Sequence, residues 1–188
     1  MKKRSHQTDK RVIFCIVCLF FLFGALGGAL AANLLKAPQK AELAAFLETA
    51  LLKQEGATFR DVFWKYLKYE LLIWIGGWML PGLFLSGTAF LFRSIAVGFT
   101  AATLLLTYGT KGIWTAVTAF LPQNLLLIPA YSILMTAAVY YLLSAQNETG
   151  KRALKRERRR RRVEYCILFM GSVLLLLLAA GLEQAVIL

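Results

Sequence analysis

Few side chains in this sequence have the types and spacings that chemistry requires. The only histidine, His6, lies in a basic tail, so neither a histidine metal site nor a Ser–His–Asp triad can be assembled. Cys15 and Cys18 have the spacing of a redox motif, but they lie in an apolar run where thiolate formation is disfavoured. No phosphate-binding loop or dinucleotide fingerprint occurs. The sequence therefore predicts no catalytic residue, no metal site and no cofactor, and we expect a protein that is not an enzyme.

The most suggestive polar segment is Pro122-Gln123-Asn124. A second proline, Pro129, follows seven residues after the first. A proline inside a helix frees the carbonyl group four residues earlier. In lipid that carbonyl must be satisfied by a polar side chain, a neighbouring helix or water, and Gln123 and Asn124 are suitably placed. Transporters often place solute sites where helices unwind. Structural helix breaking and a solute site are therefore both open interpretations of these residues.

The elements that must position these residues are apolar. Of 188 residues, 59% are hydrophobic and only 17% are charged, whereas soluble domains carry about 25% charged residues. The recurring apolar runs predict an all-α fold, a polytopic membrane helix bundle that forms one integral membrane domain over residues 1–188. We expect about five transmembrane helices, one of them broken by proline. Their expected ranges are 12–32, 69–86, 94–108, 112–143 and 163–188.

Charged residues divide the long apolar stretch at 69–108. A positive charge at the bilayer centre costs about 2.5–3.5 kcal/mol, so a turn around residues 86–94 is expected to place Arg93 at a water boundary. Glu70 is expected at the opposite boundary beside Lys68, and Glu183 near the outer surface. These charges are interpreted as boundary markers.

The segment 112–143 is too long for one straight crossing and too short for two. One tilted crossing, broken at its prolines, is the expected structure. A re-entrant half-helix at 112–121 is the alternative.

Two basic clusters set the expected orientation. Residues 1–11 carry five Lys and Arg, and residues 151–162, within the loop 145–162, carry nine. The positive-inside rule places both clusters in the cytoplasm, so we expect a multi-pass protein of the bacterial cell membrane with a cytoplasmic N-terminus. Arg158–Arg162 is expected to contact anionic lipids. Nucleic-acid binding is not expected, because no base-reading or stacking element accompanies the arginines.

The first span, 12–32, exceeds the apolar core of a signal peptide, so we expect it to be retained, with cleavage after Ala32 as the alternative. Gly24, Gly28 and Ala32 have the small-xxx-small spacing that lets a second helix approach closely. Glycine-rich packing without a specific partner helix explains the spacing equally well.

The segment 38–68 is expected to be amphipathic and to lie on the outer side of the membrane. Pro38 can start a helix and Gly56 can end it, and apolar residues recur at helical spacing on both sides of Gly56. Two interfacial helices are expected, which either anchor the bundle or dock a partner. The candidate partner face consists of Leu43, Phe46, Leu47, Leu51, Phe59 and Phe63.

Two stretches of the sequence resemble the core of the stage II sporulation protein M family. The first is Arg93-Ser-Ile-Ala-Val-Gly98, followed by Gly112; the second is Phe120-Leu-Pro-Gln-Asn124, followed by Ile128-Pro-Ala130. A basic start, a first span, an amphipathic outer segment and a Trp-rich second span extend the resemblance over most of the chain. The residues that carry this motif are Arg93, Gly98, Gly112, Pro122, Gln123, Asn124 and Pro129.

The resemblance implies a part in forespore engulfment by endospore-forming bacteria. In that family the membrane protein anchors two peptidoglycan-degrading proteins, stage II sporulation proteins P and D, at the sporulation septum. Those proteins thin the septal wall so that the mother-cell membrane can move around the forespore. The resemblance thus implies a non-enzymatic scaffold, whereas the polar residues alone leave a small-solute permease or permease subunit as the alternative. Neither the residues nor the resemblance predicts an oligomeric state.

Overall fold

The computed structural model describes residues 2–36, 38–43, 45, 58–146 and 153–187. Every regular element in this part of the chain is helical, which confirms the all-α prediction. The elements are α1 (Lys2–Asn33), α3 (Phe59–Gly76), α4 (Leu80–Thr115), the π-helical turn η1 (Ala116–Phe120), α5 (Leu121–Gln146) and α6 (Ala153–Ile187).

Four helical segments in the described part are long and apolar enough to cross a membrane. They are Lys10–Asn33, Leu80–Thr110, Leu121–Ser144 and Arg159–Ala185. α3 has 18 residues, or about 27 Å of rise, which also approaches the thickness of a hydrocarbon core. It is not among the four because it carries five charged residues. The expectation of about five transmembrane helices agrees with these four spans and α3.

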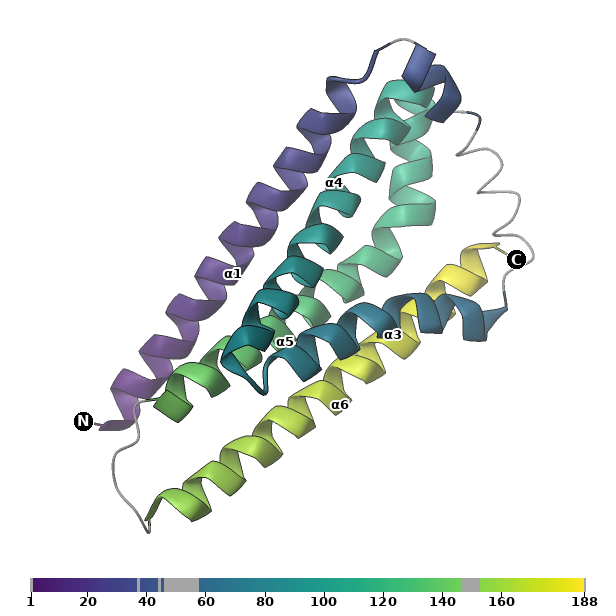
Figure 1. Cartoon of the computed structure of the whole chain (residues 1–188). Helices are drawn as coiled ribbons and strands as arrows, with labels where there is room; N and C mark the ends of the chain where they lie inside the picture. The colour runs from purple at the N-terminus through teal and green to yellow at the C-terminus, as the bar shows by residue number, and fades with distance from the viewer. Residues whose placement is uncertain (1, 37, 44, 46–57, 147–152, 188) are drawn as a thin grey trace.

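The helices form one elongated bundle in which α3 runs antiparallel to α6 (Figure 1). α3 begins beside the end of α6, where Lys65 contacts Glu183, and it ends where the Tyr165 hydroxyl reaches the carbonyl oxygen of Trp74. α1 and α6 begin at the same end of the bundle, since Lys10 and Arg161 line one pocket. The two basic clusters of the sequence therefore border helices that start together.

The predicted turn at residues 86–94 is wrong. α4 passes through these residues without interruption, and the chain reverses instead at Gly77–Met79, between α3 and α4. Gly76 and Gly82 pack so closely at this turn that a Cβ on either would collide with the other's backbone. The spans expected at 69–86 and 94–108 are accordingly replaced by α3 and by Leu80–Thr110.

The structure describes the predicted outer amphipathic segment, 38–68, only in part. Residues 59–68, expected at the membrane interface, form the first half of α3 inside the bundle, with Val62 and Tyr66 buried. Residues 38–43 are helical, and this helical segment begins at Pro38, as expected. Residues 46–57 lie outside the described residues.

The backbone between α4 and α5 is irregular in two places. Gly109 adopts a positive φ of 55°, a conformation that suits glycine, and interrupts α4 near its end. η1 precedes Pro122, which has no N–H to donate to an earlier carbonyl. Pro129 lies inside α5, which continues through it. The break expected at the prolines is thus located on the N-terminal side of Pro122.

α1 and α4 pack through glycine. A Cβ at Gly28 would collide with the backbone of Ile95, and a Cβ at Gly98 would collide with the backbone of Ala25. Gly24 likewise faces Ser94 without room for a side chain. Of the two readings of the glycine spacing in 12–32, the structure supports the close approach of a specific helix, and that helix is α4.

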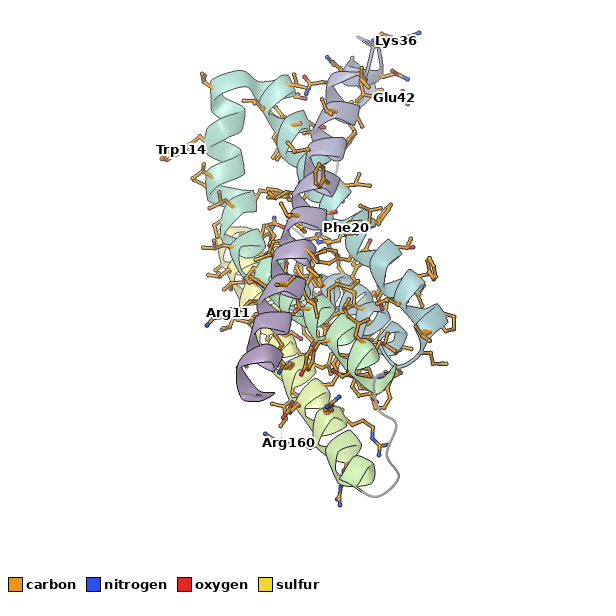
Figure 2. The ribbon with its side chains drawn as sticks, turned by 90° about the vertical axis from the view of Figure 1, so that its left-hand side faces the viewer. Arg11, Phe20, Lys36, Glu42, Trp114 and Arg160 are labelled. Atoms are coloured by element: carbon orange, nitrogen blue, oxygen red, sulfur yellow. The ribbon has the colours of Figure 1, made fainter. Side chains whose placement is uncertain are left out.

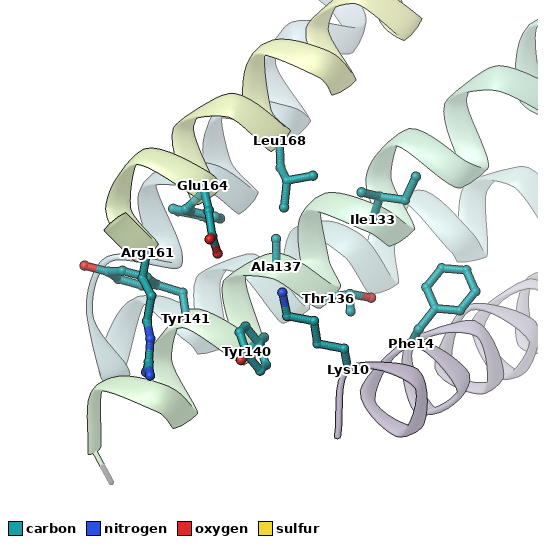
Figure 3. A pocket seen from close by; sticks show the side chains of 11 residues that line it. Lys10, Phe14, Ile133, Thr136, Ala137, Tyr140, Tyr141, Arg161, Glu164 and Leu168 are labelled. Atoms are coloured by element: carbon teal, nitrogen blue, oxygen red, sulfur yellow. The ribbon is translucent and has the colours of Figure 1, made fainter. Parts of the chain in front are cut away.

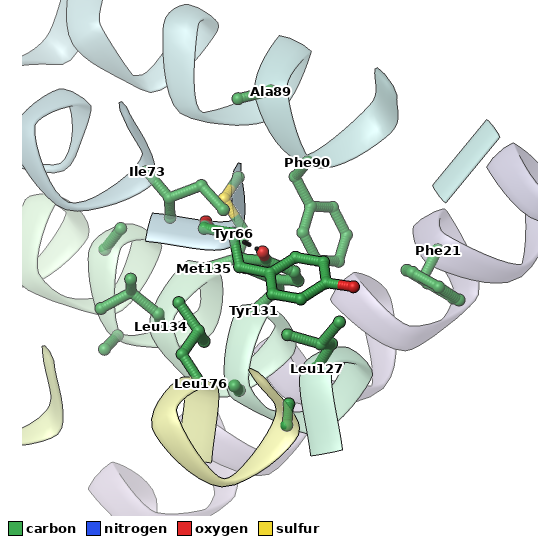
Figure 4. Packing of buried hydrophobic residues seen from close by; sticks show 14 of the residues in the cluster. Phe21, Tyr66, Ile73, Ala89, Phe90, Leu127, Tyr131, Leu134, Met135 and Leu176 are labelled. Carbon is green, nitrogen blue, oxygen red and sulfur yellow. Dashed lines mark hydrogen bonds between the residues drawn. The ribbon is translucent and has the colours of Figure 1, made fainter. Parts of the chain in front are cut away.

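The buried core lies where α3, α4, α5 and α6 meet, and α1 joins it through Val17 and Phe21. Phe90, Leu127, Leu134 and Leu176 surround the buried rings of Tyr66 and Tyr131 (Figure 4). Large apolar side chains also cover the outside of the bundle, such as Phe84 and Trp114, and Trp114 points away from it (Figure 2). An apolar exterior over a partly polar interior is the arrangement that lipid favours.

Candidate functional site

Arg93 lies near the middle of the candidate span Leu80–Thr110, not at a water boundary as the sequence predicted. Its side chain is partly buried among groups from α3 and α5. Nη2 donates to Oδ1 of Asn124 at 3.4 Å, and Cζ lies 5.3 Å and 5.9 Å from the ring centroids of Tyr66 and Tyr131. Aromatic faces attract a guanidinium electrostatically. The charge is therefore accommodated by amide and ring contacts within the bundle, which is why no turn is needed at residues 86–94.

Asn124 satisfies two demands at once. Its Oδ1 accepts from Arg93, while its Nδ2 donates to the carbonyl oxygen of Phe120 at 2.7 Å, at the end of η1. Thr118, six residues earlier, acts similarly and donates to the carbonyl oxygen of Trp114 at 2.9 Å. The expected backbone-satisfying role of the polar residues is thus present, although Asn124 serves the carbonyl of Phe120 and not the one expected four residues before a proline.

Tyr66 connects α3 to both α5 and α6. Its hydroxyl donates to Oε2 of Glu183 and lies 3.2 Å from Oε1 of Gln123. Glu183 has a side chain only 2% exposed, and its Oε1 pairs with Nζ of Lys65 at 3.3 Å. Glu183 lies close to the end of α6, as expected, but it faces the bundle and not the surface. One carboxylate therefore joins a partly exposed cation to the buried hydroxyl.

The backbone of α3 is held by hydroxyl groups from three other helices, α4, α5 and α6. Tyr131 of α5 donates to the carbonyl oxygen of Tyr66 at 3.1 Å, and Ser86 of α4 donates to that of Ile73 at 2.9 Å. Tyr165 of α6 donates to that of Trp74 at 2.9 Å. The last carbonyls of a helix have no partner within the helix, and in a membrane they need one. Tyr165 meets this need for Trp74 at the end of α3, and Ser86 adds a second donor to Ile73, whose carbonyl oxygen also accepts from the N–H of Gly77 at 3.1 Å.

Glu70 is the second acidic residue inside the bundle. It was expected at a boundary, but it is fully buried. Ser172 of α6 is a polar neighbour of Glu70, yet its hydroxyl donates to the carbonyl oxygen of Phe169 at 2.8 Å. Neither carboxylate oxygen of Glu70 has a hydrogen bond within the described part of the chain. An ionisable side chain placed in this way is a functional-site candidate in a membrane protein.

These residues form one polar cluster inside an otherwise apolar bundle. We define the polar cluster as Lys65, Tyr66, Glu70, Arg93, Gln123, Asn124, Tyr131 and Glu183. Among the residues that the structure describes, no three His, Cys, Asp or Glu side chains are grouped so as to hold a metal ion. Except for Glu70, which has no hydrogen bond in the described part of the chain, the members of the cluster make direct contacts between different helices, and such contacts fix helix positions.

A family model described as Stage II sporulation protein M matches residues 17–187, nearly the whole chain. The chain belongs to this family. The match and the four apolar spans together make it a multi-pass membrane protein of a sporulation family. No curated protein and no solved structure matches the chain significantly.

The stage II sporulation protein M motif is brought together only in part. Arg93, Gln123 and Asn124 meet in the polar cluster. Gly98 lies one and a half turns beyond Arg93 and packs against α1 instead. Pro122 directly precedes the two amides and Pro129 follows them on α5. Gly112 lies in the short helical piece that follows Gly109.

The candidate partner face is divided in the structure. Phe59 and Phe63 stack at the start of α3, with ring centroids 6.4 Å apart, and Phe63 packs on the core. Leu43 lines a pocket of about 210 Å³ with Ala32 of α1 and Thr103 of α4. The other three members, Phe46, Leu47 and Leu51, lie outside the described residues.

The sequence did not single out five members of the cluster as site residues, namely Lys65, Tyr66, Glu70, Tyr131 and Glu183. One signal was present, because Val62, Tyr66, Glu70 and Ile73 recur at helical spacing and are the buried stripe of α3. A glutamate within an apolar stripe indicates a residue that faces protein and not lipid. Tyr131 has no comparable signal in the apolar run of α5.

Proposed function

We propose that this protein is a non-enzymatic membrane scaffold that anchors peptidoglycan-degrading proteins at the sporulation septum. Its partners would be stage II sporulation proteins P and D, and its role would be septal wall thinning during engulfment. The observation that carries this proposal is the family match over residues 17–187. The polar cluster supports it, because direct helix-to-helix pairing gives a rigid platform.

The orientation that this function requires is part of the proposal. Of 22 Lys and Arg residues, 14 lie in 1–11 and 151–162. Because α1 and α6 start at the same end of the bundle, the positive-inside rule puts that end in the cytoplasm. The start of α3 and the segment before it then lie on the wall side. Arg60 and Trp64 are exposed there and line a pocket of about 480 Å³ with Thr58 and Asp61.

Photo-crosslinking in sporulating cells tests the scaffold. A photoreactive residue at Arg60 or Trp64 should form adducts with a wall hydrolase or its membrane anchor. The same residue at Arg162, exposed near the start of α6, serves as the matched control and should form none. Adducts at neither wall-side position, with normal amounts of protein in the membrane, would count against docking at this surface. Loss of the gene should leave septal wall in place and hydrolases mislocalised.

A small-solute permease or permease subunit is the second candidate function. The buried Glu70 and the Arg93–Asn124 pair favour it, since ionisable groups inside a membrane often mark solute or ion paths. This function predicts that Asn124→Ala changes solute uptake as strongly as loss of the gene does. Unchanged uptake in the deletion strain, together with blocked engulfment, would reject it.

A further inference from the structure

A pocket of about 150 Å³ lies between α1, α5 and α6 at the basic end of the bundle, away from the polar cluster. Lys10 of α1, Tyr140 of α5 and Arg161 of α6 line it together (Figure 3). Lys10 and Arg161 are 151 positions apart in the sequence, so only the folded bundle places both cations around one pocket.

Contacts with α5 hold both cations in place. Nζ of Lys10 lies 4.5 Å from the ring centroid of Tyr140, and Nη1 of Arg161 donates to the carbonyl oxygen of Ser144 at 3.1 Å. A guanidinium can bind a backbone carbonyl and a phosphate at the same time, because its donors point in different directions. Figure 3 shows the Lys10 side chain reaching from α1 towards α5.

The rest of the lining is apolar. Phe14, Ile133, Ala137 and Leu168 form the wall that continues from the two cations along the helices. Arg161 and Leu168 are seven residues apart on α6, which is about 10 Å of helix rise. The pocket therefore has a cationic part at the end of the bundle and an apolar part further along the helices. A phospholipid has the same order of groups, with its charged headgroup at the membrane surface and its acyl chain further inside.

One acidic residue, Glu164, also lines the pocket. Its Oε1 pairs with Nε of Arg160 at 3.0 Å, so its charge is compensated by a cation outside the lining. Among the described residues that line the pocket, two, Lys10 and Arg161, are basic and one, Glu164, is acidic, so cationic side chains predominate in the lining. Basic pockets between transmembrane helices bind anionic headgroups.

We propose that this pocket binds the headgroup phosphate of one anionic phospholipid, with the first part of an acyl chain along Phe14, Ile133 and Leu168. The site is distinct from a diffuse attraction of the arginine run to the membrane surface. It is also independent of any wall hydrolase, so its test does not depend on the scaffold function. A free phosphate ion would use only the cations and would leave the apolar wall without a role.

The opposite face of α6 provides a matched comparison. Arg159 and Arg162 line a pocket of about 590 Å³ with Trp78 and Met170, but only α6 and the α3–α4 turn border it. Arg162 follows Arg161 directly and carries the same charge, yet no third helix contributes to its pocket among the residues that the structure describes. Diffuse attraction predicts equal effects of removing either arginine, whereas the proposed site predicts unequal ones.

Native mass spectrometry of the full chain in mild detergent, titrated with phosphatidylglycerol or phosphatidylcholine, tests the site. The unaltered protein should bind a first phosphatidylglycerol in preference to phosphatidylcholine. Lys10→Gln and Arg161→Gln should each weaken that binding about fivefold, and Arg162→Gln should leave it within about twofold. Lys10 is exposed, so its variant should fold even if Arg161→Gln loses the contact to Ser144.

Three outcomes would overturn the proposal. Equal weakening by Arg161→Gln and Arg162→Gln would show diffuse attraction. Unchanged binding in Lys10→Gln would remove the α1 wall from the site. Displacement of phosphatidylglycerol by millimolar inorganic phosphate would show that the pocket takes a free anion and not a lipid.

Discussion

α4 is held on its two sides by opposite means. Towards α1 it presents Gly98 and Ser94 to Ala25 and Gly24, and the contact is close enough to exclude any Cβ at the glycines. Towards α3 and α5 it presents Arg93, whose contacts to Asn124 and two tyrosine rings are longer and polar. Lipid tails are as apolar as leucine, so apolar surface alone does not draw helices together in a membrane. Helices in a membrane can instead associate through close packing or through polar contacts, and the two sides of α4 show one of each.

These two means should fail differently. At the glycine interface the facing atoms belong mostly to the backbone and cannot move aside. A side chain introduced there by substitution would therefore clash with the facing helix. A polar pair can lose one partner and keep its packing, and hydrogen bonds between membrane helices are individually modest. The glycine interface should therefore be the more sensitive of the two.

The largest effect is expected at Gly28. Gly28→Leu places a side chain against the backbone of Ile95 and Phe99, and we expect a loss of about 3 kcal/mol in the free energy of unfolding. Gly27→Leu is the matched control, because a Cβ there meets nothing within 4 Å. Unfolding in mild detergent measures both. Equal losses in the two variants would remove the distinction between the α1–α4 interface and the lipid-facing side of α1.

The next largest effect is expected at Glu183. Glu183→Gln removes the charged acceptor of the Tyr66 hydroxyl and the partner of Lys65, and we expect a loss of about 2 kcal/mol. A double-mutant cycle with Tyr66→Phe should give a coupling energy of about 1 kcal/mol. Glu164→Gln breaks only the surface pair with Arg160 and should cost less than about 0.5 kcal/mol. A coupling energy near zero would mean that Glu183 and Tyr66 stabilise the bundle separately.

Arg93 sharpens the comparison because charge and shape can be separated. Arg93→Lys keeps the charge but loses the planar group that faces two rings, so about 1 kcal/mol of stability should be lost. Arg93→Met keeps most of the length and removes a charge that is costly to take out of water. The methionine variant should thus be the more stable of the two in thermal unfolding. The reverse order would show that the charge itself stabilises the bundle.

The smallest effect is expected at Tyr131. Tyr131→Phe removes one hydroxyl that donates to the carbonyl oxygen of Tyr66 and leaves the ring in the core, at a cost of about 0.6 kcal/mol. Tyr108→Phe, outside the polar cluster, is the control and should change stability by less. If Tyr131→Phe lowered the free energy of unfolding as much as Glu183→Gln does, the Tyr131 hydroxyl would stabilise the polar cluster by more than its single hydrogen bond accounts for.

Several features were predictable because they depend on local sequence. The spans over 12–32 and 163–188 are single long apolar runs, and the spacing of Gly24 and Gly28 by itself indicates a close helix contact. Of the two amides beside the prolines, Asn124 donates to a backbone carbonyl, that of Phe120, whereas Gln123 accepts from the Tyr66 hydroxyl of α3. Each of these signals lies within about two turns of one helix.

The location of Arg93 and Glu70 was not predictable in the same way. A charge in an apolar stretch belongs at a boundary unless other helices supply partners, and the partners of Arg93 lie on α3 and α5. A boundary position for Arg93 implies a turn at 86–94. This turn is the reason why the two predicted spans on either side of it, 69–86 and 94–108, have the wrong bounds. The turn at Gly77–Met79 does have a local signal, because Gly76-Gly77 begins it and Pro81 lies in the first turn of α4.

By itself, the sequence determined that the protein is helical, lies in a membrane and begins its first and last helices with basic clusters, because composition and periodicity are local properties. Tertiary structure alone decided that a charged helix, α3, enters the bundle and that its carbonyls and tyrosine are held by three other helices. The physical reason is that a polar group in lipid is tolerated only where partners are present. Those partners are 13 to 117 residues away along the chain, so only the fold brings them to it.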